Sequence, residues 1–222
     1  MTETETPNAL SKAEGPRWGR FALAVTAGII GGAIAGAVMA EVTSGSAPDW
    51  LAGSEVVAIA VATLYVIMGV AMVVALLSPE LGNRFLNFED AEEIREQRSQ
   101  LATSAGALLL MGLSLVVLAV TGDARMIDKR VGSIVLIALV VPLLVLTVRS
   151  ARLSDELMRQ LQNEAGTIAS YLISVALVGW ATLAHLGTVT PPAMLDLVSI
   201  VWLAPLIAAF WAAGRRGMLD PR

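Results

Sequence analysis

The sequence predicts an all-α, polytopic integral membrane protein with six transmembrane helices and both termini in the cytoplasm. Hydrophobic residues make up 56% of its 222 residues and the mean hydropathy is +0.72, which is more apolar material than a soluble chain of this length buries in one core. The apolar residues also lie in runs that approach or reach the ~20 residues needed to cross ~30 Å of hydrocarbon as a helix. A membrane β-barrel would alternate apolar and polar residues in stretches of ~10, and the sequence shows no such alternation.

The chain begins with a polar tail, residues 1–16, which reads MTETETPNALSKAEGP. This tail holds too little apolar surface to offset the entropy lost on ordering, so we expect it to be disordered. Residues 17–222 are predicted to form one six-helix transmembrane domain, because no other segment is long enough for a separate soluble domain.

The first apolar run covers residues 21–40. A cleaved signal peptide is the alternative, but its apolar region would have about 7–15 residues, so the length of this run favours an uncleaved anchor. Gly28, Gly32 and Gly36 recur every four residues and so share one face of the expected helix. Small residues at this spacing let helix backbones touch in lipid, which predicts a packing face toward another helix of the chain or toward a second copy.

Five further apolar runs follow, and each must be helical because lipid offers no partner to an unpaired backbone group. They cover residues 56–77, 101–121, 131–148, 165–186 and 195–213. Pro142 and Pro205 fall inside the fourth and sixth runs, where we expect kinks that serve packing. The charged residues Glu55 and Asp196 lie at the edges of runs rather than deep inside them, which argues against an ion-coupled carrier.

The distribution of basic residues predicts the orientation. Twelve of the 15 Lys and Arg residues fall in segments that are cytoplasmic if the N-terminus is inside. Basic residues near helix ends are retained on that side, so we expect a multi-pass protein of the cell membrane, typical of a bacterial inner membrane, with the lipid bilayer as its surroundings. The formal net charge of −4 disfavours nucleic acid as a partner, because nucleic acid requires a basic surface.

Two charged connectors, residues 78–100 and 149–164, are predicted to lie on the cytoplasmic side. Each places a Glu three residues before an Arg and then enters an apolar run, which predicts a parallel repeat of the hairpins formed by helices 2–3 and 4–5. The connectors are candidate docking surfaces for other membrane proteins or for a homo-oligomer, and packing of the two connectors on each other is the alternative. The candidate docking residues are Glu92, Arg95, Glu156 and Arg159.

The sequence carries no catalytic or metal-binding motif. Cysteine is absent and histidine occurs once, at His185, which excludes thiolate sites and any site that needs two imidazoles from one chain. We therefore predict no catalytic residue, no metal site and no cofactor. Ala181 and His185 form an Ala-x-x-x-His pattern that is similar to the one with which light-harvesting polypeptides ligate bacteriochlorophyll. This resemblance implies a pigment- or haem-binding membrane subunit as a remote alternative.

Three classes of function follow from these patterns. We favour a non-catalytic accessory or interaction subunit that docks through its cytoplasmic connectors. The alternative is a small uncoupled transporter or channel, since six helices with internal repetition resemble the build of small carriers. An intramembrane enzyme is least favoured, because no nucleophile, base or metal set converges at one depth of the sequence.

Overall fold

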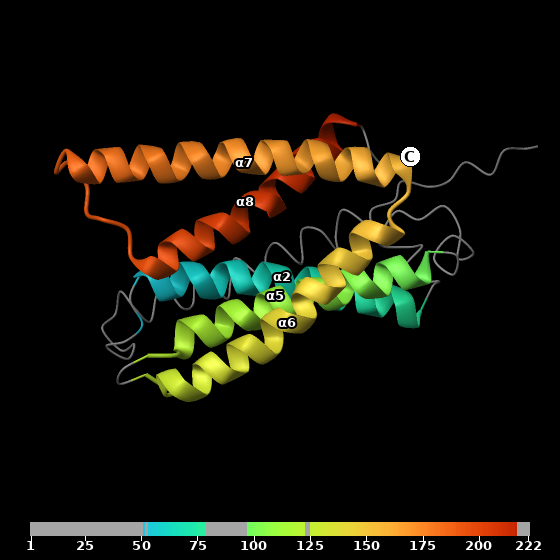
Figure 1. The fold of residues 1–222 in the computed structure, drawn as a ribbon, viewed down its shortest axis with the longest axis horizontal. Helices are drawn as coiled ribbons and strands as arrows, with labels where there is room; N and C mark the ends of the chain where they lie inside the picture. The colour runs from blue at the N-terminus through green and yellow to red at the C-terminus, as the bar shows by residue number, and fades with distance from the viewer. Residues whose placement is uncertain (1–50, 52, 79–96, 123–124, 217–222) are drawn as a thin grey trace, which may run out of the picture.

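The computed structural model describes residues 51, 53–78, 97–122 and 125–216. Within these residues the chain folds into long helices joined by short loops (Figure 1). The helices are α2 (Gly53–Leu77), α5 (Arg98–Val120), α6 (Lys129–Leu153), α7 (Glu156–His185) and α8 (Met194–Arg215). An isolated β-bridge pairs Thr121 with Ile127 in the loop between α5 and α6.

All five described helices are long and apolar enough to cross a membrane, which confirms the predicted all-α class and five of the expected spans. The first apolar run, residues 21–40, lies outside the described residues, so the sixth span stays a prediction. The same holds for the expected disorder of residues 1–16. The predicted packing face of Gly28, Gly32 and Gly36 also lies outside the described residues.

Side-chain caps set the starts of α6 and α7. The Asp128 carboxylate accepts from the Arg130 N–H at 2.8 Å, and the Asp155 carboxylate accepts from the Met158 N–H at 2.7 Å. Both bonds satisfy backbone donors that have no partner within the first turn of a helix. Just past the end of α7, Gly187 has a φ of 72°, the left-handed conformation that commonly terminates a helix.

The described core lies where α2, α5 and α8 meet. Tyr65 of α2 is buried, and its hydroxyl donates to the Trp202 carbonyl of α8 at 2.6 Å. The two rings also meet edge to face, with centroids 6.5 Å apart. Leu115 of α5 and Leu206 of α8 are buried in the same cluster. The core therefore joins α8 to the α2–α5 pair, and the hydrogen bond from Tyr65 to Trp202 satisfies the buried hydroxyl among apolar side chains.

Glycines bring α2 and α5 into close contact. A Cβ added to Gly112 would lie 2.7 Å from Cγ2 of Val66 and 2.9 Å from the Ala62 carbonyl oxygen. A Cβ added to Gly69 would lie 2.7 Å from Cγ of Leu109. At each glycine, atoms of the neighbouring helix occupy the place that a side chain would need, as expected where small residues let helices approach in lipid.

The helices form two groups. α2, α5 and α6 pack in sequence, α2 against α5 and α5 against α6, while α8 packs against both α2 and α7 (Figure 1). α7 is set apart from the first three helices, with α8 between. Although a short turn joins α6 to α7, these two helices do not pack along their lengths as α2 and α5 do. The predicted parallel repeat of hairpins is therefore not confirmed and stays a prediction.

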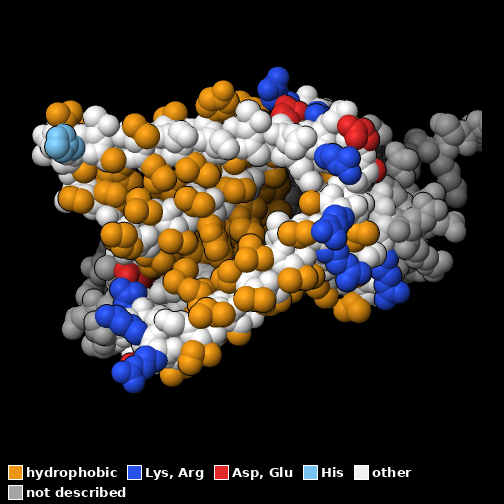
Figure 2. Space-filling view, in the orientation of Figure 1, with side chains coloured by type: hydrophobic (Ala, Val, Ile, Leu, Met, Phe, Trp, Pro, Cys, Tyr) orange, Lys and Arg blue, Asp and Glu red, His pale blue; other side chains and the backbone are white. Residues whose placement is uncertain are grey.

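The described basic residues lie at the two ends of the helices (Figure 2). The end where α2, α6 and α8 begin carries Arg125, Lys129 and Arg130. The opposite end carries Arg98, Arg149, Arg152, Arg159, Arg215 and Arg216. More of the described basic residues lie at this second end, as we predict for the cytoplasmic side of the membrane. The orientation itself stays a prediction.

Candidate functional site

The junction between α6 and α7 is the described part of the predicted docking surface. Residues 149–164, predicted as a connector, are helical apart from Ser154 and Asp155. The Ser154 hydroxyl is buried, donates to the Ser150 carbonyl at 2.9 Å and accepts from the Gln162 amide at 3.0 Å. Since Asp155 caps α7, both turn residues are hydrogen-bonded. These bonds link the end of α6, through the Ser154–Asp155 turn, to the first two turns of α7.

Glu156 and Arg159 lie in that first turn. Nη1 of Arg159 is 3.7 Å from Oε2 of Glu156, and the two side chains are 56% and 72% exposed, respectively. An exposed pair of this kind contributes only ~0–1 kcal/mol to stability. The pair is therefore solvent-exposed and adds little to the stability of the fold. Glu92 and Arg95 lie outside the described residues, so a docking surface built from both connectors stays a prediction.

A second ion-pair group at the same end joins α7 to α8, and it was not predicted from the sequence. Arg216 donates from Nε and Nη2 to one carboxylate oxygen of Glu164, at 3.0 and 2.9 Å. Nη1 of Arg215 lies 3.7 Å from the other oxygen. The sequence did hold a signal for this contact: Glu164 lies just before the apolar run 165–186, and Arg215 and Arg216 lie just after the run 195–213. These contacts hold the charged start of α7 against the end of α8.

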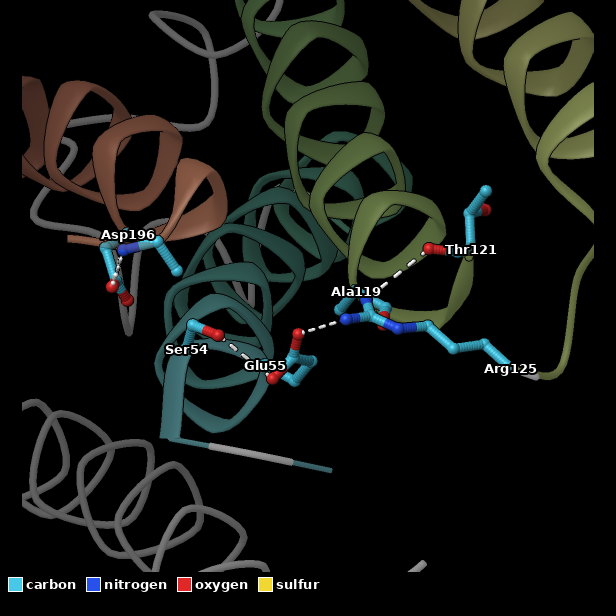
Figure 3. A network of polar contacts seen from close by, with 7 residues as sticks. Ser54, Glu55, Ala119, Thr121, Arg125 and Asp196 are labelled. Atoms are coloured by element: carbon cyan, nitrogen blue, oxygen red, sulfur yellow. Dashed lines mark hydrogen bonds and ion pairs between the residues drawn. The ribbon is translucent and has the colours of Figure 1, made fainter. Parts of the chain in front are cut away.

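The opposite end holds an ion pair between a buried carboxylate and a partly buried arginine (Figure 3). Glu55, in the first turn of α2, is buried, and its Oε1 lies 2.5 Å from Nη2 of Arg125. Arg125 also donates from Nη1 to the carbonyls of Ala119 and Thr121, at 3.1 and 3.4 Å, and the Ser54 hydroxyl donates to the second Glu55 oxygen at 3.0 Å. Carbonyls at the end of a helix lack donors within that helix. One arginine therefore ties the start of α2 to the end of α5.

The remaining carboxylate in this view has a structural role. The Asp196 side chain accepts from the Ala193 N–H at 2.8 Å and so fixes the start of α8 (Figure 3). Within the described residues, no group of three or more His, Cys, Asp or Glu side chains could hold a metal ion. The chemistry that the described residues provide at both ends is salt bridging and helix capping.

His185 is the last residue of α7 and is exposed, as is Ala181 one turn earlier. The Ala-x-x-x-His pattern thus lies on the open surface of α7, at the end of the molecule that carries the Glu55 pair. Ligation of a pigment or haem at this position stays the remote alternative, and the prediction of no cofactor is likewise untested.

Comparisons with protein-family models, with curated proteins and with solved structures each gave no match for this chain.

Proposed function

We propose that this chain is a non-catalytic integral membrane protein, an accessory or interaction subunit that docks partners through its charged cytoplasmic connectors. The observation that carries the proposal is the Glu156–Arg159 pair, which is exposed on a helix start that hydrogen bonds hold in place. A fixed and solvated charge pair can select a complementary surface without a large conformational cost.

The length of α7 supports a docking role for its first turns. At 1.5 Å per residue its 30 residues are ~45 Å long, which exceeds the ~30 Å of hydrocarbon in a bilayer. The apolar part of α7 begins only near Gly166, so the preceding turns with Glu156 and Arg159 stand outside the hydrocarbon. They are placed where a membrane partner or a soluble partner can reach them.

A transporter or channel receives less support from the side chains within the spans. The hydroxyls of Thr63, Thr103, Ser114, Thr147 and Ser199 each donate to the carbonyl four residues earlier in their own helix. A hydroxyl bonded in this way serves its own helix and does not donate to a passing solute. We therefore keep docking as the proposed function and transport as the alternative.

The proposal includes a cell-membrane location with both termini in the cytoplasm, as in a bacterial inner membrane. It rests on the twelve of 15 basic residues that this orientation places inside.

Charge reversal tests the docking proposal. The variant carries Glu→Arg at 92 and 156 and Arg→Glu at 95 and 159, and partner recovery is measured by affinity purification from native membranes. We expect recovery to fall while membrane insertion and thermal stability stay at parental values, because exposed pairs contribute little to folding. Arg130→Glu is a matched control, since it reverses an exposed charge at the other end of the molecule and is expected to leave recovery unchanged.

Two results would contradict the docking proposal. Unchanged partner recovery in the four-residue variant would show that the connectors do not dock. Loss of the folded protein would show instead that the connectors pack on each other.

A further inference from the structure

A hollow lies between α6 and α7. The two helices diverge from the Ser154–Asp155 turn and do not pack along their lengths, and α8 crosses behind them (Figure 1). Figure 2 shows that this face of the molecule is hollowed between the two helices, with apolar side chains over the floor. We call this space the α6–α7 hollow.

The surface beside the hollow suits the acyl chains of a lipid. Large apolar side chains are exposed on both α6 and α8, among them Leu144, Val148, Ile207 and Phe210. Another helix would pack more closely on small residues, which let backbones touch in lipid. A flexible acyl chain can follow an uneven surface of branched and aromatic side chains, and it recovers the dispersion contacts that an empty space would lose.

Basic side chains border the hollow at the end where α6 meets α7 (Figure 2). The arginines that α6 and α7 carry at this end are Arg149, Arg152 and Arg159. Arg159 pairs with Glu156, whereas no carboxylate of the described residues pairs with Arg149 or Arg152. Both are exposed, and their spacing of three residues puts them on neighbouring positions of the surface of α6. The end of α6 thus presents two positive charges that the described chain does not neutralise.

The end of α8 has the opposite arrangement. Arg215 and Arg216 both contact the Glu164 carboxylate of α7. The retention of basic residues on the cytoplasmic side accounts for arginines at the ends of both α6 and α8. It does not account for the difference between them, because only the arginines of α8 have a carboxylate beside them among the described residues.

We propose that the α6–α7 hollow binds one anionic phospholipid of the leaflet at this end, with its phosphate on Arg149 and Arg152 and its acyl chains between α6 and α7. Guanidinium groups match phosphate oxygens in geometry and charge, and basic pockets between transmembrane helices bind anionic head groups. A phospholipid combines a negative head group with apolar chains, as the arginines and the hollow beside them require. The lipid site goes beyond the proposed docking function and uses none of its four charges.

Lipid titration of the full chain tests the site. The chain is purified in a mild detergent, and native mass spectrometry measures the binding of phosphatidylglycerol and of zwitterionic phosphatidylcholine. We expect one tightly bound phosphatidylglycerol and weaker binding of phosphatidylcholine. Each arginine near an anionic membrane surface contributes about fivefold to affinity, so the double variant Arg149→Gln with Arg152→Gln should bind phosphatidylglycerol about 25-fold more weakly.

Arg98→Gln is the matched control. It removes the same charge at the same end of the molecule, but from the start of α5. Arg98 is exposed and, like Arg149 and Arg152, has no carboxylate partner among the described residues. We expect Arg98→Gln to bind phosphatidylglycerol as the parent does, because its arginine is not on the helices that border the hollow.

A phosphatidylglycerol with a photoreactive diazirine in its acyl chain locates the chains. We expect labelled peptides from α6, α7 and α8 in the parent, and several-fold less label on the same peptides in the double arginine variant. Inorganic phosphate and glycerol 3-phosphate carry the anion without the chains, so neither should displace the labelled lipid.

Four results would overturn the lipid site. They are equal affinity for the two lipids, an equal loss of affinity in Arg98→Gln and in the double variant, displacement of the lipid by inorganic phosphate, and label that does not depend on Arg149 and Arg152. The first two would show only a general attraction of charge, and the third would show a site for soluble anions. The docking proposal would stand in each case, because all these variants keep the four docking charges.

Discussion

Replacing Gly112 with Ala tests whether the contact between α2 and α5 depends on a missing side chain. The new methyl group would lie 2.7 Å from Cγ2 of Val66, 2.9 Å from the Ala62 carbonyl oxygen and 3.2 Å from the Val66 nitrogen. Favourable contacts between heavy atoms begin near 3.5 Å. The Val66 side chain can rotate away, but the two backbone atoms can move only if α2 itself shifts.

The expected free-energy change has two opposing parts. Overpacking of this kind costs about 1–3 kcal/mol. Alanine is also a better helix former than glycine by about 1 kcal/mol, which offsets part of that loss. A matched control removes the second part: Gly179→Ala makes the same change within α7, where an added Cβ meets nothing within 4 Å. We expect Gly112→Ala to be less stable than Gly179→Ala by about 1–3 kcal/mol.

Thermal unfolding of both purified variants in the same detergent measures this difference. Gly112→Ala should melt below the parent, and Gly179→Ala should melt at or above it. If the two variants melt together, or if Gly112→Ala is the more stable, then the helices are not in contact at this glycine and our packing argument is wrong.

Three further predictions concern the ion pairs, the orientation and the first apolar run. Glu55→Gln should lower the free energy of unfolding by about 1–3 kcal/mol, because it leaves a partly buried arginine without its charged partner. Glu156→Gln, in an exposed pair, should change the free energy of unfolding by less than about 1 kcal/mol. Equal melting temperatures of the two variants would contradict this prediction. A reporter inserted in 188–193 should be accessible from outside the cell while terminal reporters are cytoplasmic, and an external N-terminus would refute the orientation. Gly32→Ile should lower stability or dissociate an oligomer by overpacking while Ile34→Leu stays near neutral, and a Gly32→Ile variant as stable and as associated as the parent would exclude a packing face there.

The five described spans could be predicted from the sequence because their signal is local. An apolar run of nearly 20 residues must be helical in lipid whatever surrounds it. The ends of the helices were harder to predict from the sequence. α7 begins at Glu156, well before its apolar run, because the Asp155 cap and the Ser154 turn start the helix in the polar segment. Such caps depend on single side chains and are easily overlooked in a charged stretch.

The contacts between helices could not be predicted as readily. Glu55 and Arg125 lie far apart in the sequence, and no local pattern links them. The contact at Gly112 does have a signal in the sequence: small residues recur every seven positions at Ala105, Gly112 and Ala119, and all three are buried. This spacing marks a packing face of small residues on α5, but the partner helix follows only from the three-dimensional arrangement.

The most direct measurement of the central claim is purification of the chain from native membrane in a mild detergent, with mass spectrometry of what remains bound. Our account predicts a stoichiometric protein partner, either a second copy or another membrane protein, that is lost when the charges of the connectors are reversed. A pure single chain that carries a solute across the membrane of liposomes would contradict the account and favour the transporter.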